Sequence, residues 1–293
     1  MAPHLTGSLG RALNVVGDPV VIRFDGTSDT EVALATVGGR TFADLPELLA
    51  AAEGDTGRIE SGAPLALAHP DALLTPVARP RKIICVGKNY LEHVREFGGE
   101  AGPKHPDLFA KWDNALAGPF DTLPLPPESS SVDFEAELTV VIGRRSRRLT
   151  REAVQDAVFG FTAANDGSVR DFQNHTTQRT AGKAWDRLTP LGPVVVPVAH
   201  LGGVVPDVRV TGLLNGEVMQ DDRTTSLMFD IPSLLVYITT VMTLEPGDLV
   251  LTGTPSGVGG AREPKVFLRD GDTYEVRVEG VGSLVNRYRT ESV

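Results

Sequence analysis

The sequence contains a single cysteine, Cys85, among 293 residues, and it has no long apolar run. One cysteine excludes an internal disulfide framework and any zinc or iron–sulfur site built from several cysteines, which fits a reducing compartment. No stretch approaches the roughly 18 apolar residues that a membrane-spanning helix needs. Residues 1–16 lack the sustained apolar core of a signal peptide. The sequence therefore predicts a cytoplasmic protein without a membrane partner.

The chain also has fewer basic than acidic residues. The chain has 28 Lys and Arg against 38 Asp and Glu, a formal net charge of −10. Binding to nucleic acid needs clustered cations that neutralise phosphates, so no nucleic-acid partner is expected. The basic run at residues 144–148 follows an expected strand and is interpreted as a solvated turn.

The composition changes along the chain near residues 76–80, where two prolines interrupt any regular element. Residues 1–75 hold four basic and ten acidic residues, whereas the remainder holds 24 basic and 28 acidic ones. We therefore predict a small N-terminal α/β domain over residues 1–75 and a larger domain over residues 76–293.

The apolar patterns predict more strands than helices. Strands are expected at 20–26, 31–39, 82–87, 132–143, 159–167 and 248–254, with a hairpin at 267–280 around the Asp270–Gly271 turn. Helices are expected at 42–54, 150–160 and 230–242, each beginning or ending at a capping residue. Strands and helices do not alternate strictly, so the sequence predicts a mixed α+β fold and not a doubly wound parallel sheet.

Three acidic residues form the most informative pattern. Glu135 and Glu137 share one face of the strand expected at 132–143, roughly 6–7 Å apart. Asp166 lies at the expected end of a second strand. Three carboxylates with water oxygens suit a hard divalent cation such as Mg²⁺, Mn²⁺ or Ca²⁺. The alternative interpretation is an acidic strand face exposed to solvent.

A histidine and a glutamate lie one helical turn apart after the strand at 82–87. If this segment is helical, His93 and Glu96 can hydrogen-bond, and the pair would act as a general base. The alternative is an ordinary surface helix turn. The glycine- and proline-rich segment at 96–106 resembles a mobile loop that could close over such a base.

Several donors could bind an anionic substrate. Arg170 and Gln173 follow Asp166 closely, and Arg can bind a carboxylate through two hydrogen bonds. Lys183 and Lys111 are further candidate cations. The turn at 252–260 fails both the phosphate-loop and the dinucleotide patterns, but it could present backbone N–H groups and the Thr254 hydroxyl to a carboxylate.

These segments together resemble the fumarylacetoacetate hydrolase family from about Lys82 to Val293. The matching stretches are ICVGKNYLEHVREFG, DFEAELTVVIG, FGFTAANDGSVRDFQ, GKAWDRLTPLGP, NGEVMQ, LEPGDLVLTGTPSGVG and LRDGDTYEVRVEGVGSLVN. The resemblance implies a mixed β-roll catalytic domain behind a small N-terminal domain, assembled as a homodimer. Departures from the family pattern at Gly167, Trp185 and the residues after Lys111 bear on the shape of the substrate.

The resemblance also implies roles for individual residues. A divalent metal, Mg²⁺ or Mn²⁺ with Ca²⁺ as a further option, would be held by Glu135, Glu137 and Asp166. The implied catalytic residues are His93, Glu96 and Lys183, and the implied substrate-binding residues are Arg170, Gln173 and Thr254. Lys111 is added to the predicted substrate-binding residues as a candidate cation.

The reaction expected from this constellation is hydrolysis of a carbon–carbon bond in an acylpyruvate-like 2-oxo acid, through a metal-stabilised enolate. Loss of CO₂ from an oxaloacetate-type acid, or proton migration in an unsaturated 2-hydroxy diacid, would use the same enolate, so both remain alternatives. A non-catalytic binding protein on the same fold is the third alternative.

Overall fold

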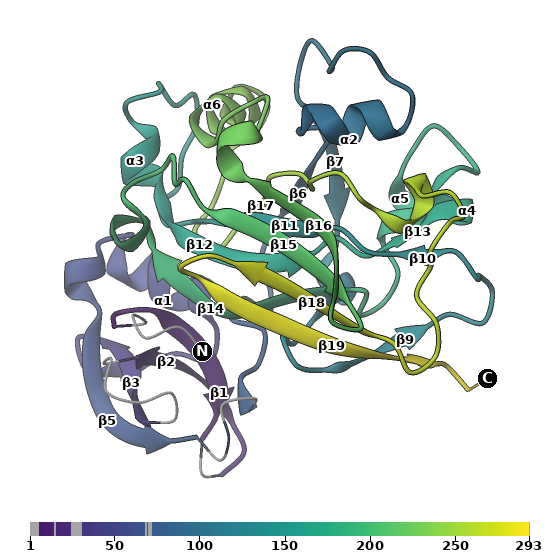
Figure 1. The fold of residues 1–293 in the computed structure, drawn as a ribbon. Coiled ribbons are helices and arrows are strands. Elements are labelled where there is room, and N and C mark those ends of the chain that lie inside the picture. The colour runs from purple at the N-terminus through teal and green to yellow at the C-terminus, as the bar shows by residue number, and fades with distance from the viewer. Residues whose placement is uncertain (1–5, 15, 25–30, 68, 70–71, 293) are drawn as a thin grey trace.

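A computed structural model of the chain describes residues 6–14, 16–24, 31–67, 69 and 72–292. Its architecture is mixed α+β, mostly sheet with few helices, which confirms the predicted fold class. The largest sheet has twelve strands, in the order β4-β3-β2-β1-β14-β12-β11-β17-β6-β7, with β5 paired to β3 and β8 to β14. A five-stranded sheet, β16-β15-β18-β19-β9, packs against its central strands (Figure 1).

The strands have the following bounds. The large sheet contains β1 (Leu9–Leu13), β2 (Pro19–Phe24), β3 (Glu31–Val37), β4 (Arg40–Thr41), β5 (Glu60–Ala66), β6 (Ile83–Gly87), β7 (Asp107–Lys111), β8 (Leu116–Ala117), β11 (Ala136–Ile142), β12 (Val158–Asn165), β14 (Thr189–Pro197) and β17 (Leu249–Leu251). The five-stranded sheet contains β9 (Thr122–Leu125), β15 (Arg209–Leu214), β16 (Glu217–Arg223), β18 (Thr273–Val278) and β19 (Gly282–Thr290). A separate pair is formed by β10 (Val132–Asp133) and β13 (Ser168–Val169).

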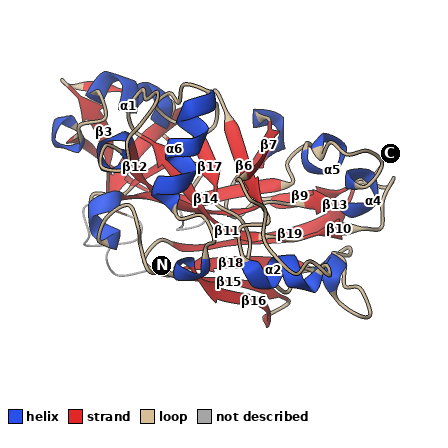
Figure 2. Cartoon of the chain, turned by 90° about the horizontal axis from the view of Figure 1, so that it is seen from above, coloured by secondary structure: helices blue, strands red, loops and turns tan. Residues whose placement is uncertain are grey.

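The helices are short and lie around the margins of the sheets, as Figure 2 shows. They are α1 (Leu45–Ala52), α2 (Leu91–Glu96), α3 (Val154–Ala157), α4 (Arg170–Gln173), α5 (Thr180–Lys183) and α6 (Ile231–Val241). Helix α6 begins where the sequence predicts, because the Asp230 carboxylate accepts from the Ser233 N–H at 3.0 Å and Pro232 occupies the first turn.

Two sequence-based expectations are wrong. The helix expected at 150–160 is only the single turn α3, and Gly160 lies inside strand β12. A Cβ at Gly160 would lie 2.1 Å from the Val196 carbonyl oxygen, so this glycine allows two strands to approach. The hairpin expected at 267–280 is absent because residues 267–269 are not in a strand, and β18 pairs instead with β15 and β19.

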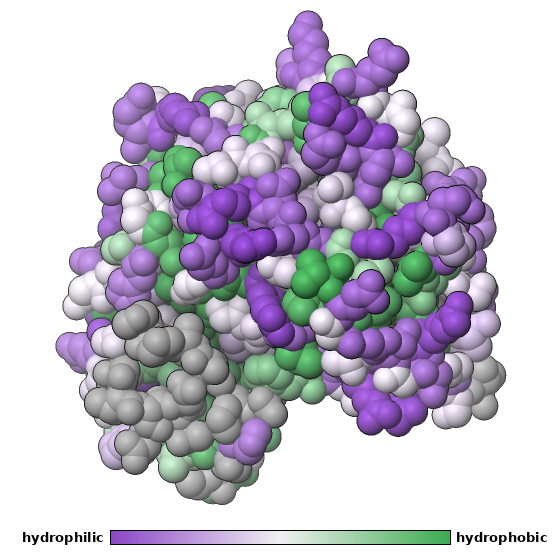
Figure 3. Space-filling model, viewed as in Figure 1, coloured by the Kyte–Doolittle hydropathy of each residue, from purple (hydrophilic) through white to green (hydrophobic). Residues whose placement is uncertain are grey.

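The central strands β11 and β12 are buried along their whole length, between neighbouring strands and the second sheet. Such strands are apolar on both faces, which explains the continuous apolar run that ends β11. The face of the molecule in Figure 3 is mostly hydrophilic, with apolar side chains in separate patches. Within the described residues, no helix is long and apolar enough to cross a bilayer.

The two strands predicted in the leading segment are present as β2 and β3, and they pair antiparallel with Ile22 opposite Leu34. Its strand β1 pairs with β14 at Leu9 and Val195, so the leading strands continue the large sheet. The division between residues 75 and 76 stays a prediction.

One buried carboxylate ties the leading helix to the segment at the predicted boundary. Asp44 caps α1 by accepting from the Leu45 N–H at 2.9 Å. It also accepts from the Ala78 N–H at 2.9 Å and from the Arg79 N–H at 2.8 Å. One side chain therefore fixes both the start of the helix and the path of the following chain.

Substituting Asp44→Ala should lower the free energy of unfolding by roughly 2–3 kcal/mol, because a cap and two further buried hydrogen bonds are lost. Denaturant unfolding of the full chain measures the change. The control is Asp55→Ala, which removes only the exposed hydrogen bond from the Gly57 N–H and should cost less than about 1 kcal/mol. Equal losses for the two variants would contradict the connecting role of Asp44.

Candidate metal centre and the cavity beside it

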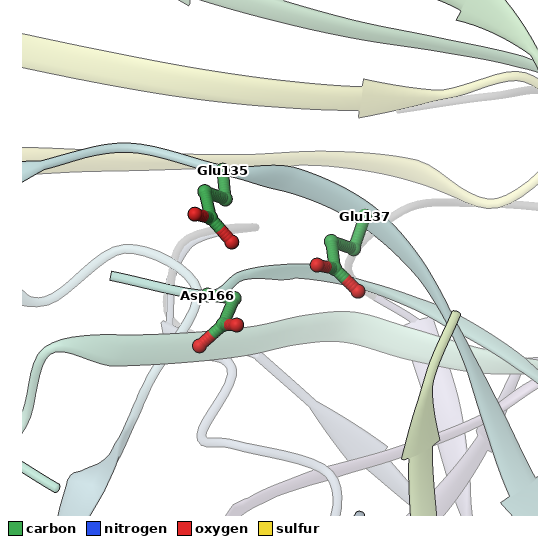
Figure 4. Close-up of side chains that lie close together, drawn as sticks. All are labelled: Glu135, Glu137 and Asp166. Carbon is green, nitrogen blue, oxygen red and sulfur yellow. The ribbon is translucent and has the colours of Figure 1, made fainter. Parts of the chain in front are cut away.

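The three acids predicted to bind a metal lie together. Glu135 precedes β11, Glu137 is within β11 and Asp166 follows β12. The two strands pair with Ala136 opposite Asn165, which brings the three carboxylates to the same end of the pair. One oxygen from each acid lies within 4.8 Å of the others, and all three residues are buried (Figure 4).

Cations enclose this acidic triad from one side. The Lys183 ammonium lies 2.8 Å from Glu135 Oε2 and 2.6 Å from Asp166 Oδ2. Lys111 Nζ lies 2.5 Å from Asp166 Oδ1, and Arg170 Nη2 lies 2.7 Å from Glu135 Oε1. Glu135 and Asp166 therefore each have two cationic partners.

Glu137 is compensated differently. Its Oε2 accepts from the Gly253 N–H at 2.8 Å, and no salt bridge joins it to a described residue. Burial raises the pKa of Glu137, and the carboxylates of Asp166 and Glu135 add to the shift, so this pKa lies well above its ordinary value. Burial alone would also raise the pKa of Glu135, but Lys183 and Arg170 outweigh it and hold that pKa below its ordinary range.

The donor set fits a divalent cation. Three converging carboxylates are the hard oxygen ligands that Mg²⁺ and Mn²⁺ prefer. The charge of Glu137, which the protein leaves without a cationic partner, is the charge that such an ion would compensate.

The His93–Glu96 pair is present as the sequence predicts. Both residues belong to α2, and His93 Nδ1 lies 2.6 Å from Glu96 Oε1. The other oxygen of Glu96 accepts from the Gly257 N–H at 2.7 Å. Because a carboxylate accepts hydrogen bonds, Nδ1 carries the proton in the neutral imidazole and Nε2 is left as the basic nitrogen.

A cavity of about 350 Å³ brings most of the predicted site residues together. Those lining it are His93, Glu135, Glu137, Arg170, Gln173, Lys183 and Thr254. Glu96 and Asp166 lie behind this lining and contact it through His93 and Lys183. A larger hollow of about 450 Å³, lined in part by Trp185, contains none of the predicted site residues.

Lys111 is placed differently from the other predicted substrate ligands. Its side chain is fully buried, and Nζ also donates to the Gly167 carbonyl oxygen at 2.9 Å. The ammonium group is thus enclosed behind Asp166 and does not line the cavity. Lys111 therefore contacts the triad from outside the cavity lining, and its predicted role in substrate binding stays a prediction.

Thr254 lines the cavity, but its hydroxyl proton is already used. Its Oγ1 donates to the Ala136 carbonyl oxygen at 3.0 Å and accepts from Gln220 Nε2 at 2.7 Å. Donation from this hydroxyl to a substrate carboxylate would have to replace its hydrogen bond to Ala136, so the predicted role of Thr254 stays a prediction, and the backbone of the turn is a further candidate donor. The same turn supplies the N–H groups that hold Glu137 and Glu96, so it links the triad to the histidine pair.

Sequence reasoning missed two residues that support this site. Asp133 is fully buried, and its carboxylate accepts from the N–H groups of Gly259 and Gly260 and from Arg170 Nε at 2.7 Å. Gln220 joins the Thr254 turn to the Ala136 N–H. Asp133 alternates with the two glutamates, and this spacing could have identified it as a site residue. Nothing in the local sequence identifies the partners of Gln220.

The chain is similar to known proteins over most of its length. A profile of the fumarylacetoacetate hydrolase family, described as "Fumarylacetoacetate (FAA) hydrolase C-terminal", matches residues 82–289. Oxaloacetate tautomerase FAHD2A of Bos taurus, a mitochondrial protein by name, is 41% identical over 216 residues, which are 73% of this chain and 68% of the relative. The protein of that name from Homo sapiens is 38% identical over 216 residues, with the same coverage.

Two solved structures resemble the whole chain. A fumarylacetoacetate hydrolase from Exiguobacterium antarcticum superposes with a TM-score of 0.85 at 32% identity, covering 97% of this chain and 99% of the other. A 5-carboxymethyl-2-hydroxymuconate delta-isomerase from Mycobacterium smegmatis has a TM-score of 0.79 at 32% identity, covering 97% and 100%.

Glu135 has cationic partners and Glu137 has none, so replacing each glutamate should have opposite effects on the stability of the metal-free protein. Because the pKa of Glu137 is raised in the folded protein, its protonated side chain contributes to stability at low pH. This contribution is lost as pH rises through the raised pKa. Glu137→Gln should therefore raise the melting temperature at about pH 8, with a smaller difference at about pH 5. Glu135→Gln should lower stability by about 3 kcal/mol, because Lys183 and Arg170 lose a buried partner.

Thermal unfolding in the presence of a chelator measures both effects. Added Mg²⁺ or Mn²⁺ should stabilise the unsubstituted protein more than either variant, because each variant lacks one carboxylate ligand. Shifts of the same sign for the two metal-free variants would contradict the charge distribution described above.

Proposed function

Because this chain belongs to the fumarylacetoacetate hydrolase family and is an enzyme of the hydrolase, decarboxylase or isomerase type, we propose that it interconverts the keto and enol forms of an oxaloacetate-type 2-oxo acid. The observation that carries the proposal is the cavity lined by Glu135 and Glu137 of the acidic triad together with Lys183 and His93, with Asp166 directly behind Lys183. The names of the relatives support the choice of tautomerisation over the hydrolysis expected from the sequence alone.

The triad residues would hold the metal. Glu135, Glu137 and Asp166 would bind one Mg²⁺ or Mn²⁺, and the bound ion would supply Lewis-acid polarisation of the 2-oxo carbonyl group. Arg170 and Gln173 would orient the substrate carboxylate together with backbone N–H groups of the turn at Thr254. Asp133 and Lys111 would act as positioning residues, since each contacts a site residue and neither lines the cavity.

The proton transfer is assigned to His93. Its Nε2 takes a proton from C3 of the keto acid, and the electron pair of that bond shifts to the carbonyl oxygen. Glu96 holds the ring and stabilises the imidazolium that forms. The Lys183 ammonium stabilises the negative charge on the enolate oxygen, which then receives the proton carried by the His93 imidazolium, giving the enol and restoring the neutral base.

A second candidate is the carbon–carbon hydrolysis of an acylpyruvate. It is favoured by the preassembled His93–Glu96 pair, because the same basic nitrogen could deprotonate a water molecule that attacks the distal carbonyl carbon. Loss of CO₂ from oxaloacetate would pass through the same enolate and is a third outcome of the same arrangement. A binding protein without activity is disfavoured, since all the residues named for catalysis lie together around one cavity.

The predicted homodimer and the predicted cytoplasmic location stay predictions. The relatives compared above from Bos taurus and Homo sapiens are mitochondrial by name, so the compartment of this chain needs a direct measurement.

Removing the base should abolish the tautomerisation. His93→Gln should slow the exchange of the C3 protons of oxaloacetate in D₂O, measured by NMR, by roughly 100-fold or more. Metal binding measured by calorimetry should persist. His105→Gln is the control, because His105 stacks on Tyr237 and does not line the cavity. Exchange within a few fold of the unsubstituted enzyme would exclude His93 as the base.

A product assay separates the candidate reactions. With Mg²⁺ or Mn²⁺ present, we expect kcat/KM for oxaloacetate tautomerisation to exceed that for acylpyruvate cleavage by at least roughly tenfold. Pyruvate release from oxaloacetate is followed in the same samples to detect decarboxylation. Faster acylpyruvate cleavage would overturn the proposal in favour of the hydrolase.

A further inference from the structure

Two cations line the cavity but have no role in the reaction proposed above. They are Lys88, which directly follows β6, and Arg179, which directly precedes α5. The two cations differ in how their charges are balanced, and this difference carries the inference.

Arg179 is already paired. Its guanidinium donates to both oxygens of Asp107, at 2.9 and 2.6 Å. It lies against Gly87, where an added Cβ would be 3.2 Å from its Nη1, and over the ring of Phe109. Arg179 is therefore a fixed part of the cavity wall whose charge Asp107 neutralises.

Lys88 has a free ammonium group on a rigid backbone. Its side chain is exposed to solvent and makes no hydrogen bond or ion pair with the described residues. The adjacent Asn89 fixes the backbone, because its side-chain amide donates to the carbonyl oxygens of Phe229 and Thr252 and accepts from the Phe229 N–H. The pKa of Asp107 is lowered mainly by its hydrogen bonds from Arg179, with a smaller effect of the nearby Lys88 charge.

The backbone of Lys88 is in the left-handed region, with φ at 58°. A residue with a side chain is strained in this region, whereas glycine is not. A lysine kept in this conformation at the wall of a cavity suggests that its side chain is needed there.

The charges of the cavity match a ligand with two carboxylates. At that end the three acids of the triad and Asp133 face Lys111, Lys183 and Arg170, so a divalent cation would leave one positive charge. The charges of Lys88, Arg179 and Asp107 sum to one further positive charge in the cavity wall. The cavity thus offers one positive centre for the 2-oxo carboxylate and one for a second carboxylate.

We propose that Lys88 binds the distal carboxylate of a dicarboxylic 2-oxo acid and so selects dicarboxylic over monocarboxylic substrates. This inference rests on the proposed function, since it names the substrate class of the same site. Asp107 and Arg179 would support it by forming a neutral wall beside Lys88.

The test compares Lys88→Gly with Arg148→Gly. Arg148 is also an exposed cation in the left-handed region, with φ at 55°, and it does not line the cavity. Both substitutions should leave the melting temperature equal or higher, because each relieves the same backbone strain. They differ only in whether the lost cation lines the cavity.

The first measurement is C3 proton exchange with oxaloacetate and with 2-oxobutanoate, which has a methyl group in place of the distal carboxylate. The ratio of kcat/KM for the two acids should fall by roughly tenfold or more in Lys88→Gly, the loss typical of one hydrogen bond to a charged group. The ratio should be unchanged in Arg148→Gly and largely restored in Lys88→Arg. An unchanged ratio in Lys88→Gly would overturn the inference.

The second measurement does not depend on catalysis. Malate and 2-hydroxybutanoate, which lack the 2-oxo group, are titrated into the magnesium-loaded protein by calorimetry. Lys88→Gly should weaken malate binding by roughly tenfold relative to 2-hydroxybutanoate. If no 2-oxo acid undergoes exchange but this selective loss is seen, the proposed reaction fails and the subsite stands. Equal weakening of both ligands would overturn the subsite.

Discussion

The structure depends on the cost of burying three carboxylates at the centre of a β-sheet. Glu135, Glu137 and Asp166 lie at one end of the β11–β12 pair, where their side chains are buried from bulk solvent. Lys183, Lys111 and Arg170 compensate two of them and leave Glu137 without a cationic partner. A divalent cation would remove this imbalance, because a buried charge must be paired or neutralised.

One turn connects this charge cluster to the proposed base. Its N–H groups at Gly253 and Gly257 hold Glu137 and Glu96, respectively, so both ends of the proposed chemistry are fixed by a single backbone segment. Gln220 in turn anchors that segment to the strand that carries the glutamates. The positions of metal ligand and base are therefore coupled, which suits a reaction in which carbonyl polarisation and proton removal occur on adjacent atoms.

Local chemistry made part of this molecule predictable. Helix α6 begins at Asp230 because a cap and a proline act within a few residues, and the His93–Glu96 contact follows from one helical turn. The helix expected at 150–160 failed because strand pairing at Gly160 overrides helix propensity. The existing partners of Lys111 and Thr254 could not be predicted, because residue type indicates a charge or a hydroxyl group but not which neighbour it contacts.

The sequence by itself determined the fold class, the family and the candidate set of acids, base and cations, since these depend on residue types at short and regular spacings. Only the tertiary structure decided which of them share the cavity, which carboxylate lacks a partner and which lysine is free. Asp166 contacts Lys111, which is 55 residues away in the sequence, and Gln220 contacts Ala136, which is 84 residues away. Contacts over such separations are set by strand register and sheet packing, which no local pattern in the chain specifies.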